Sequence, residues 1–80
     1  MAKDFNVQQT LDLSGEVCPY TFVNSKLALE DLESGQVLEV IVDNSESATN
    51  VPRSIKGEGH EILALEKQGK KSFHIYCKKK

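Results

Sequence analysis

Eighty residues are enough for one small hydrophobic core and too few for two, so we expect a single domain over residues 1–80, with residues 1–4 as a loose terminus. The chain is 39% hydrophobic and 28% charged, as in ordinary globular proteins, and it lacks the roughly 20 consecutive apolar residues that a membrane helix requires. Because its first residues also lack the apolar core of a signal peptide, the predicted location is the cytoplasm.

The charges are segregated along the chain, although the formal net charge is only −2. Acidic residues gather in the middle of the sequence, and six lysines lie toward its end, at Lys67, Lys70, Lys71, Lys78, Lys79 and Lys80. The simpler interpretation is a solvated surface with a basic tail, and the alternative is a polar docking surface for a protein. The lysines are not interleaved with an aromatic stripe, which argues against a nucleic-acid groove.

The first strand is predicted from Gln8 to Leu13, where apolar and polar residues alternate, and a Ser-Gly pair ends it at a turn. Cys18 and Pro19 follow, directly before a segment with helical character. Proline suits the first helical position, which needs no N–H group. Cys18 is therefore expected at a helix N-terminus, where the helix dipole and free N–H groups favour a thiolate.

The first helix is predicted from Pro19 or Tyr20 to about Glu33, where a second Ser-Gly pair is a stop signal. Its apolar residues do not form one clean face, because Phe22 and Val23 cannot both lie on the side of the later leucines. Either both side chains are buried, or one stays exposed beside the cysteine. An exposed one would be an anchor for a partner protein.

The next strand, from Gln36 to Val42, is almost continuously apolar and β-branched, as expected in the middle of a sheet. A second helix is predicted from about Glu46 to Lys56, with a kink or an early end at Pro52. Capping side chains are available just before this helix, at Asp43, Asn44 and Ser45.

The last two strands are predicted from His60 to Glu66 and from about Lys71 to Lys78, joined by a turn at residues 68–70. The order is then β-α-β-α-β-β, which places the chain in the α+β class. Strand–helix–strand units favour parallel pairing, and the final hairpin adds an antiparallel pair. We expect a two-layer α/β sandwich with a mixed four-stranded sheet and both helices on one face.

The two cysteines have different expected roles. They are too few for a disulfide framework and lack the Cys-x-x-Cys spacing of zinc or thioredoxin-type sites, although a disulfide between them stays open. Cys77 shares a face with Phe73 and Ile75 and is expected to pack in the core. For Cys18, the spacing alone favours neither a reactive thiol nor a small buried hydrophobic residue.

The remaining polar candidates have modest expected roles. His60 and His74 are interpreted as surface or hydrogen-bonded residues, so no metal site is predicted. Asp12 is expected to stabilise the turn. Asp43 is expected at the same sheet edge as Cys18, most simply as a helix cap.

Asp12, Gly15, Cys18 and Pro19 resemble the motif of the small TusA-like (SirA/YedF-type) sulfur carrier family. In that family an aspartate, a glycine and a Cys-Pro-x-Pro sequence follow the first strand. The resemblance extends from about residue 10 to the end of the chain, in element order and in length. One position departs from the motif, since Thr21 stands where the family has its second proline.

The resemblance implies that Cys18 accepts a sulfane sulfur as a persulfide and passes it on, a chemistry close to thiol–disulfide exchange. Gly15 and Pro19 would shape its loop, and the helix start would depend on Thr21. Lys26 would contact a partner protein, with a solvated lysine as the alternative. The implied partners are a sulfur donor protein, either a cysteine desulfurase or a rhodanese-type enzyme, and a sulfur acceptor protein. No cofactor is implied, and the surface pattern suggests a monomer.

Two other hypotheses stay open. Thr21 motivates a non-catalytic interaction or regulatory module of the same fold, in which Cys18 would be an ordinary thiol. RNA binding through the lysine-rich end is the third, and it predicts a steep dependence of affinity on salt.

Overall fold

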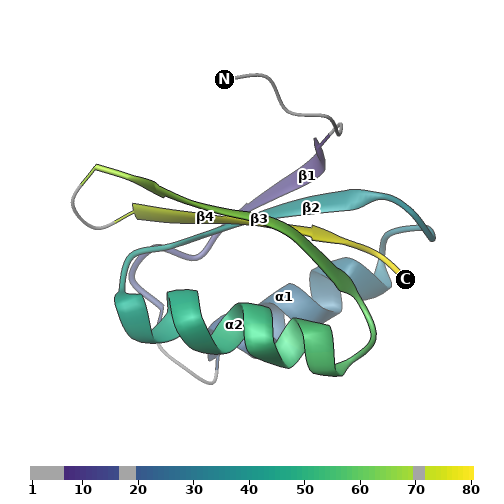
Figure 1. Cartoon of the computed structure of the whole chain (residues 1–80), viewed down its shortest axis with the longest axis horizontal. Helices are drawn as coiled ribbons and strands as arrows, with labels where there is room; N and C mark the ends of the chain where they lie inside the picture. The colour runs from purple at the N-terminus through teal and green to yellow at the C-terminus, as the bar shows by residue number, and fades with distance from the viewer. Residues whose placement is uncertain (1–6, 17–19, 70–71) are drawn as a thin grey trace.

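The computed structural model describes residues 7–16, 20–69 and 72–80, which form two layers (Figure 1). One layer is a sheet with the order β1-β2-β4-β3, made of β1 (Val7–Asp12), β2 (Val37–Val42), β3 (Glu61–Gln68) and β4 (Ser72–Lys78). The other layer consists of α1 (Tyr20–Glu30) and α2 (Ser45–Gly57), which pack against each other on one face of the sheet. The predicted fold class, element order and layering are confirmed.

The sheet is mixed, as predicted. β1 pairs with β2 in parallel, while β4 pairs antiparallel with both β2 and β3. The most apolar strand, β2, is one of the two central strands. Both edge strands contain a register shift, between Val7 and Gln9 in β1 and between Ile62 and Ala64 in β3. Such irregularities disfavour edge-to-edge pairing between molecules.

The core lies between the sheet and the helices. Its fully buried apolar side chains come from both layers and are Leu29, Leu38, Val40, Val42, Val51, Ile55, Ile75 and Cys77. Cys77 is therefore a core residue, as its pattern predicted, and its thiol is free. Its Sγ lies 3.5 Å from the Leu38 carbonyl oxygen, to which it donates, and burial raises the pKa of this thiol to about 12. A thiol that stays protonated and covered is unsuited to sulfur transfer.

The end of α1 differs from the sequence-based expectation, whereas the end of α2 lies close to it. α1 ends at Glu30, three residues early, and Gly35, with φ of +89°, serves the turn before β2 instead of capping the helix. α2 continues through Pro52 to Gly57, within one residue of the predicted Glu46–Lys56 at each end, so of the two alternatives at Pro52 the early end is wrong. The burial of Val51 and Ile55 on either side of Pro52 opposes the cost of about 3 kcal/mol that an internal proline imposes.

The end of α2 is closed by a hydrogen-bonded turn. Gly59, with φ of +99°, donates its N–H to the Lys56 carbonyl, and His60 donates its N–H to the Ile55 carbonyl. This is the Schellman arrangement, in which glycine is favoured because the left-handed backbone strains other residues. Among the described residues, no helix combines the length and hydrophobicity that a membrane span requires.

Candidate functional site

The predicted site lies where β1 and β2 end. Cys18 and Pro19 are outside the described residues, so the site is defined here by the segments on either side of them. Because β1 and β2 are parallel, the turn after β1 and the loop after β2 meet at the same edge of the sheet. The described residues on either side of the cysteine are Glu16, in the turn after β1, and Tyr20, the first residue of α1.

The turn after β1 is held by local hydrogen bonds. The Asp12 carboxylate accepts from the Ser14 N–H at 2.9 Å, and the Glu16 N–H donates to the Leu13 carbonyl at 3.0 Å. The hydrogen bond from the Ser14 backbone holds the pKa of Asp12 below its ordinary value. Gly15 has φ of +89°, a conformation that side chains with a Cβ rarely adopt.

A second set of hydrogen bonds ties this turn to the loop after β2. The Gly15 N–H donates to Asp43 Oδ2 at 2.8 Å, and the Leu13 N–H donates to the Ile41 carbonyl at 2.7 Å. Asn44 Nδ2 reaches the Glu16 carbonyl at 3.5 Å. The segment that leads to the cysteine is therefore fixed by residues almost thirty positions further along the chain.

Asp43 lies at the predicted sheet edge, but its expected role as a helix cap is wrong. The cap is Asn44, whose extended backbone directly precedes α2 and whose Oδ1 accepts from the Ser47 N–H at 2.7 Å. Asp43 stands one residue too early for this role, and its carboxylate instead holds Gly15. The sequence pattern offered both residues as caps and contained no signal for the contact with Gly15.

Thr21 is fully buried at the contact between the two helices. Its Oγ1 lies 3.3 Å from Ser47 Oγ on α2, and its carbonyl accepts from Ser25 Oγ at 2.7 Å. Thr21 and Ser25 are small, so they let α1 approach α2 closely. The position at which the family motif has a proline is thus part of the packing between α1 and α2.

α1 also carries an exposed apolar stripe, formed by Tyr20, Val23 and Leu27, with exposed fractions of 60%, 44% and 54%. Their spacing of three and four residues places them on one face of the helix. Phe22, which we expected as a partner anchor if exposed, is partly buried and packs against the core. Of the two neighbours, Val23 is the exposed one, because successive helical residues point about 100° apart.

Lys26, the other expected partner contact, pairs with the residue that follows α2. Its Nζ lies 3.7 Å from Glu58 Oε1, and both side chains are 43% exposed. A surface ion pair of this kind contributes little to stability, typically about 0–1 kcal/mol. The Lys26 ammonium group is thus within reach of a second molecule.

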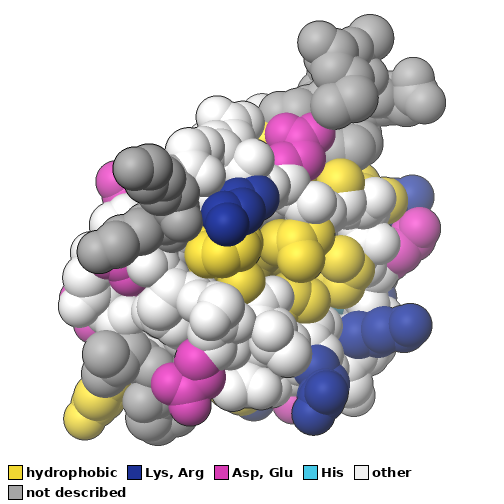
Figure 2. Space-filling model, turned by 60° about the vertical axis from the view of Figure 1, so that its left-hand side comes forward, with side chains coloured by type: hydrophobic (Ala, Val, Ile, Leu, Met, Phe, Trp, Pro, Cys, Tyr) yellow, Lys and Arg dark blue, Asp and Glu magenta, His cyan; other side chains and the backbone are white. Residues whose placement is uncertain are grey.

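The β3–β4 hairpin comes to the same end of the sheet as the Gly15 turn. Phe73 pairs with Val42, directly before Asp43, and also with Lys67 of β3. Figure 2 shows hydrophobic side chains gathered on the side of the molecule that bears this hairpin, with basic side chains beside them. Leu65 is half exposed, and Lys67 Nζ lies 5.7 Å from the centre of the Phe73 ring.

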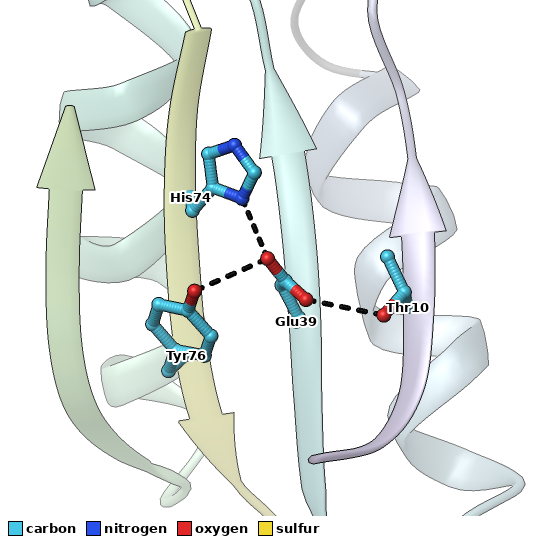
Figure 3. Close-up of polar contacts among 4 residues, drawn as sticks. All are labelled: Thr10, Glu39, His74 and Tyr76. Atoms are coloured by element: carbon cyan, nitrogen blue, oxygen red, sulfur yellow. Dashed lines mark hydrogen bonds and ion pairs between the residues drawn. The ribbon is translucent and has the colours of Figure 1, made fainter. Parts of the chain in front are cut away.

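The helix-free face of the sheet carries a polar network that the sequence reading missed. Glu39 accepts from Thr10 Oγ1 at 3.1 Å and from the Tyr76 hydroxyl at 3.2 Å, and it pairs with His74 Nδ1 at 2.5 Å (Figure 3). Burial alone would raise the pKa of Glu39, but the hydrogen bonds from His74, Thr10 and Tyr76 outweigh it and hold the pKa below its ordinary value. The network joins β1, β2 and β4, and so fixes β1, which leads into the Gly15 turn, against the rest of the sheet.

Both histidines are engaged within the fold. His74 is bound to Glu39, and His60 Nδ1 accepts from the Lys80 N–H at 3.2 Å. In the part of the chain that the structure describes, no three histidine, cysteine or carboxylate side chains are grouped closely enough to hold a metal ion. The two histidines are therefore hydrogen-bonded residues, as expected.

Comparisons with known proteins agree with this architecture. The family model described as Sulfurtransferase TusA matches residues 9–79. A protein of Archaeoglobus fulgidus named "Putative sulfur carrier protein" is 46% identical over 79 residues, covering 99% of this chain and 90% of that protein. A protein of the same name from Thermotoga maritima is 42% identical over the full length of both chains.

Among solved structures, the SirA-like protein of Desulfitobacterium hafniense has the same fold. The two structures superpose with a TM-score of 0.79 at 30% identity, covering 88% of this chain and 95% of the other. The similarity thus includes sequence and fold over nearly the whole chain.

Proposed function

The chain belongs to the sulfurtransferase TusA family, which supports a sulfur carrier role, and we propose that it carries sulfane sulfur as a persulfide on Cys18. The observation that carries this proposal is the fixed turn before Cys18. The Gly15 N–H is bound by Asp43, and α1 begins at Tyr20, two residues after Cys18 in the sequence.

The proposed relay consists of two thiolate attacks. In the first, the Cys18 thiolate attacks the outer sulfur of a persulfide on the donor; the S–S bond of the donor breaks, and the donor cysteine leaves as a thiolate. In the second, an acceptor thiolate attacks the outer sulfur of the Cys18 persulfide, and the Cys18 thiolate leaves. The sulfane sulfur is transferred from one thiolate to another without net oxidation. Neither step requires a metal or cofactor bound to this chain.

A helix N-terminus serves both steps in the same way. Its free N–H groups and the helix dipole stabilise the Cys18 thiolate, first as the nucleophile and then as the leaving group. The carboxylates of Asp12 and Asp43 at this turn would disfavour a thiolate close to them, but each already accepts a hydrogen bond from a backbone N–H group. The second thiol of the chain, Cys77, is excluded from the relay by its burial.

The partners in this proposal are a cytoplasmic sulfur donor protein, either a cysteine desulfurase or a rhodanese-type enzyme, and a sulfur acceptor protein. A protein that reaches Cys18 must also cover the beginning of α1. The apolar stripe of Tyr20, Val23 and Leu27 offers the contact area there, and Lys26 lies beside Leu27 in sequence. A few anchor residues carry most of the binding energy in protein interfaces, and tyrosine is enriched among them.

The test is the intact mass of the protein after incubation with cysteine and a cysteine desulfurase. We expect a gain of one sulfur atom that reductant reverses. Cys77→Ala should gain it equally, while Cys18→Ala should not. A Cys18→Ala variant that carried sulfur like the unmodified protein would contradict the proposal.

A second candidate is a non-catalytic interaction module, which the burial of Thr21 between the helices favours because the family motif has a proline there. The two candidates differ in the reactivity of Cys18. A carrier thiol should react with iodoacetamide well below neutral pH, whereas a thiol with an ordinary pKa should react slowly there. Slow alkylation, together with no mass gain from several donors, would favour the module.

A further inference from the structure

The end of the sheet farthest from the Gly15 turn contains a hollow of about 390 Å³. Lys78, at the end of β4, pairs with both Val37 and Glu61, the first residues of β2 and β3. The Gly15 turn instead lies beyond the last residues of β1 and β2. The hollow is lined by Ser34, Gly35, Gly59, Glu61 and the lysines at 78–80.

Among the described residues of this lining, lysines 78, 79 and 80 outnumber the one acidic side chain, Glu61. Lys80 Nζ donates to the Glu58 carbonyl at 2.9 Å. Within the described part of the chain, the ammonium groups of Lys78 and Lys79 form neither a hydrogen bond nor an ion pair. Two ammonium groups thus remain available at a recess of the surface.

The lysine segment is fixed by its backbone, unlike a frayed terminus. The Gly35 N–H donates to the Lys79 carbonyl at 2.9 Å, and the Lys79 N–H donates to the Gln36 carbonyl at 2.8 Å. Gly59 leaves room for the Lys80 side chain, since a Cβ there would lie 3.0 Å from Lys80 Cδ. The side of the hollow that these lysines form therefore has a fixed backbone.

The charges of Lys79 and Lys80 also act on His60, which lies next to this segment. His60 is almost fully buried, and burial together with the charges of Lys79 and Lys80 lowers its pKa below the ordinary value. The neutral imidazole accepts from the Lys80 N–H. Glu58 acts in the opposite direction, but the two lysines and burial prevail.

We propose that this hollow is a second binding site, which takes a small oxyanion with two phosphate groups or their equivalent. Its volume lies in the range of small-ligand sites, about 300–1,000 Å³. Lysine binds phosphate as a compact point charge, and Lys78, Lys79 and Ser34 are among the residues that line this hollow. The Glu61 carboxylate on the same wall limits the affinity for a fully charged anion.

The short extent of this basic segment favours a small ligand over RNA. A nucleic-acid surface needs basic residues along an extended track, with aromatic side chains on which bases stack. Here three consecutive lysines line one recess, and among the residues that the structure describes its lining includes no aromatic side chain. The site lies at the opposite end of the sheet from the Gly15 turn, and it does not depend on the proposed chemistry of Cys18.

The test is a titration of the 15N-labelled full chain with inorganic pyrophosphate, followed through backbone amide shifts. We expect saturable shifts at Gly35, Gly59 and Lys79, with none at Gly15. Lys79→Gln should weaken binding about tenfold, as loss of one charge-assisted contact implies. The matched control is Lys67→Gln, which removes the same charge at the other end of the sheet and should leave the affinity unchanged.

Three outcomes would overturn the proposal. The first is the absence of saturable shifts in a chain whose spectrum shows that it is folded. The second is an equal loss of affinity in Lys67→Gln, which would indicate attraction to net charge alone. The third is saturable binding of a short single-stranded RNA without binding of pyrophosphate. Cys18→Ala should bind pyrophosphate normally, so failure of this site and failure of the sulfur carrier proposal are distinguishable.

Discussion

The two helices lie on the same face of the same sheet, yet they distribute their side chains differently. α2 buries apolar residues at Ala48, Val51 and Ile55. α1 buries Thr21 and Ser25 together with Ala28 and Leu29, and exposes the stripe of Tyr20, Val23 and Leu27. Ala48, Val51 and Ile55 of α2 all face the core, whereas α1 contributes residues to the core and also exposes a second apolar face to solvent.

The reason for the difference lies in the contact between the helices. Thr21 and Ser25 are small, and the Thr21 hydroxyl contacts Ser47 of α2 while the Ser25 hydroxyl donates to the Thr21 carbonyl, so they let α1 pack closely against α2. Tyr20, Val23 and Leu27 then point outward, while Phe22 packs against the core. Departures from the amphipathic rule are expected where a protein is shaped for function, and this one begins at the residue that follows Pro19.

The largest expected effect contrasts a buried residue of α2 with an exposed residue of α1. Ile55→Ala should lower the free energy of unfolding by about 2–5 kcal/mol, because it leaves a cavity in the core. Leu27→Ala should change it by no more than about 0.5 kcal/mol, because its side chain is half exposed. Urea denaturation measures both, and a similar loss in the two variants would show that the α1 stripe is structural.

The next effect concerns the partner. Leu27→Ser should weaken the apparent affinity for a sulfur donor about tenfold, as expected for loss of an interface anchor, without a change in Tm. Thr49→Ala on the exposed side of α2 is the control and should not alter sulfur uptake. The rate of mass gain at limiting donor measures both variants. If the two rates are equal, the donor does not use the stripe.

The contact between the helices gives a smaller effect. Thr21→Val keeps the shape of the side chain but removes the hydroxyl that faces Ser47, so the free energy of unfolding should fall by about 1 kcal/mol. Thr49→Val makes the same change at an exposed position of α2 and should be nearly neutral. Denaturation curves of the two variants, compared with the unmodified chain, test whether the hydroxyl matters. Equal stabilities would assign the role of Thr21 to packing alone.

The smallest effect is a pH dependence from the sheet beneath both helices. The folded pKa of Glu39 lies below its ordinary value of 4.5, so its stabilising contribution is present above that value and is lost as pH falls through the folded pKa. Glu39→Gln should therefore lose less stability than the unmodified chain between about pH 5 and pH 3. Glu33→Gln, at an exposed position, should keep the original pH profile. Parallel profiles for all three proteins would contradict this role of Glu39.

Much of the fold could be predicted from local patterns. The alternation before Leu13, the apolar run of β2 and the hairpin at residue 69 define the strands, and Cys77 shares its apolar face with Ile75 in the sequence and in the core. The cysteine–proline pair at a turn, and its resemblance to a known motif, indicated the candidate site. These features depend on residues within one element, which is the range over which periodicity carries information.

The tertiary structure decided the contacts between elements. The bond from Gly15 to Asp43, the pairing of Thr21 with Ser47 and the network around Glu39 join residues 26 to 37 positions apart. The basic hollow likewise forms only when Gly35, Gly59 and the last lysines meet at one end of the sheet. Local sequence sets which residues form a strand or a helix, but strand register and helix packing set which side chains meet, because those depend on pairing across the whole chain.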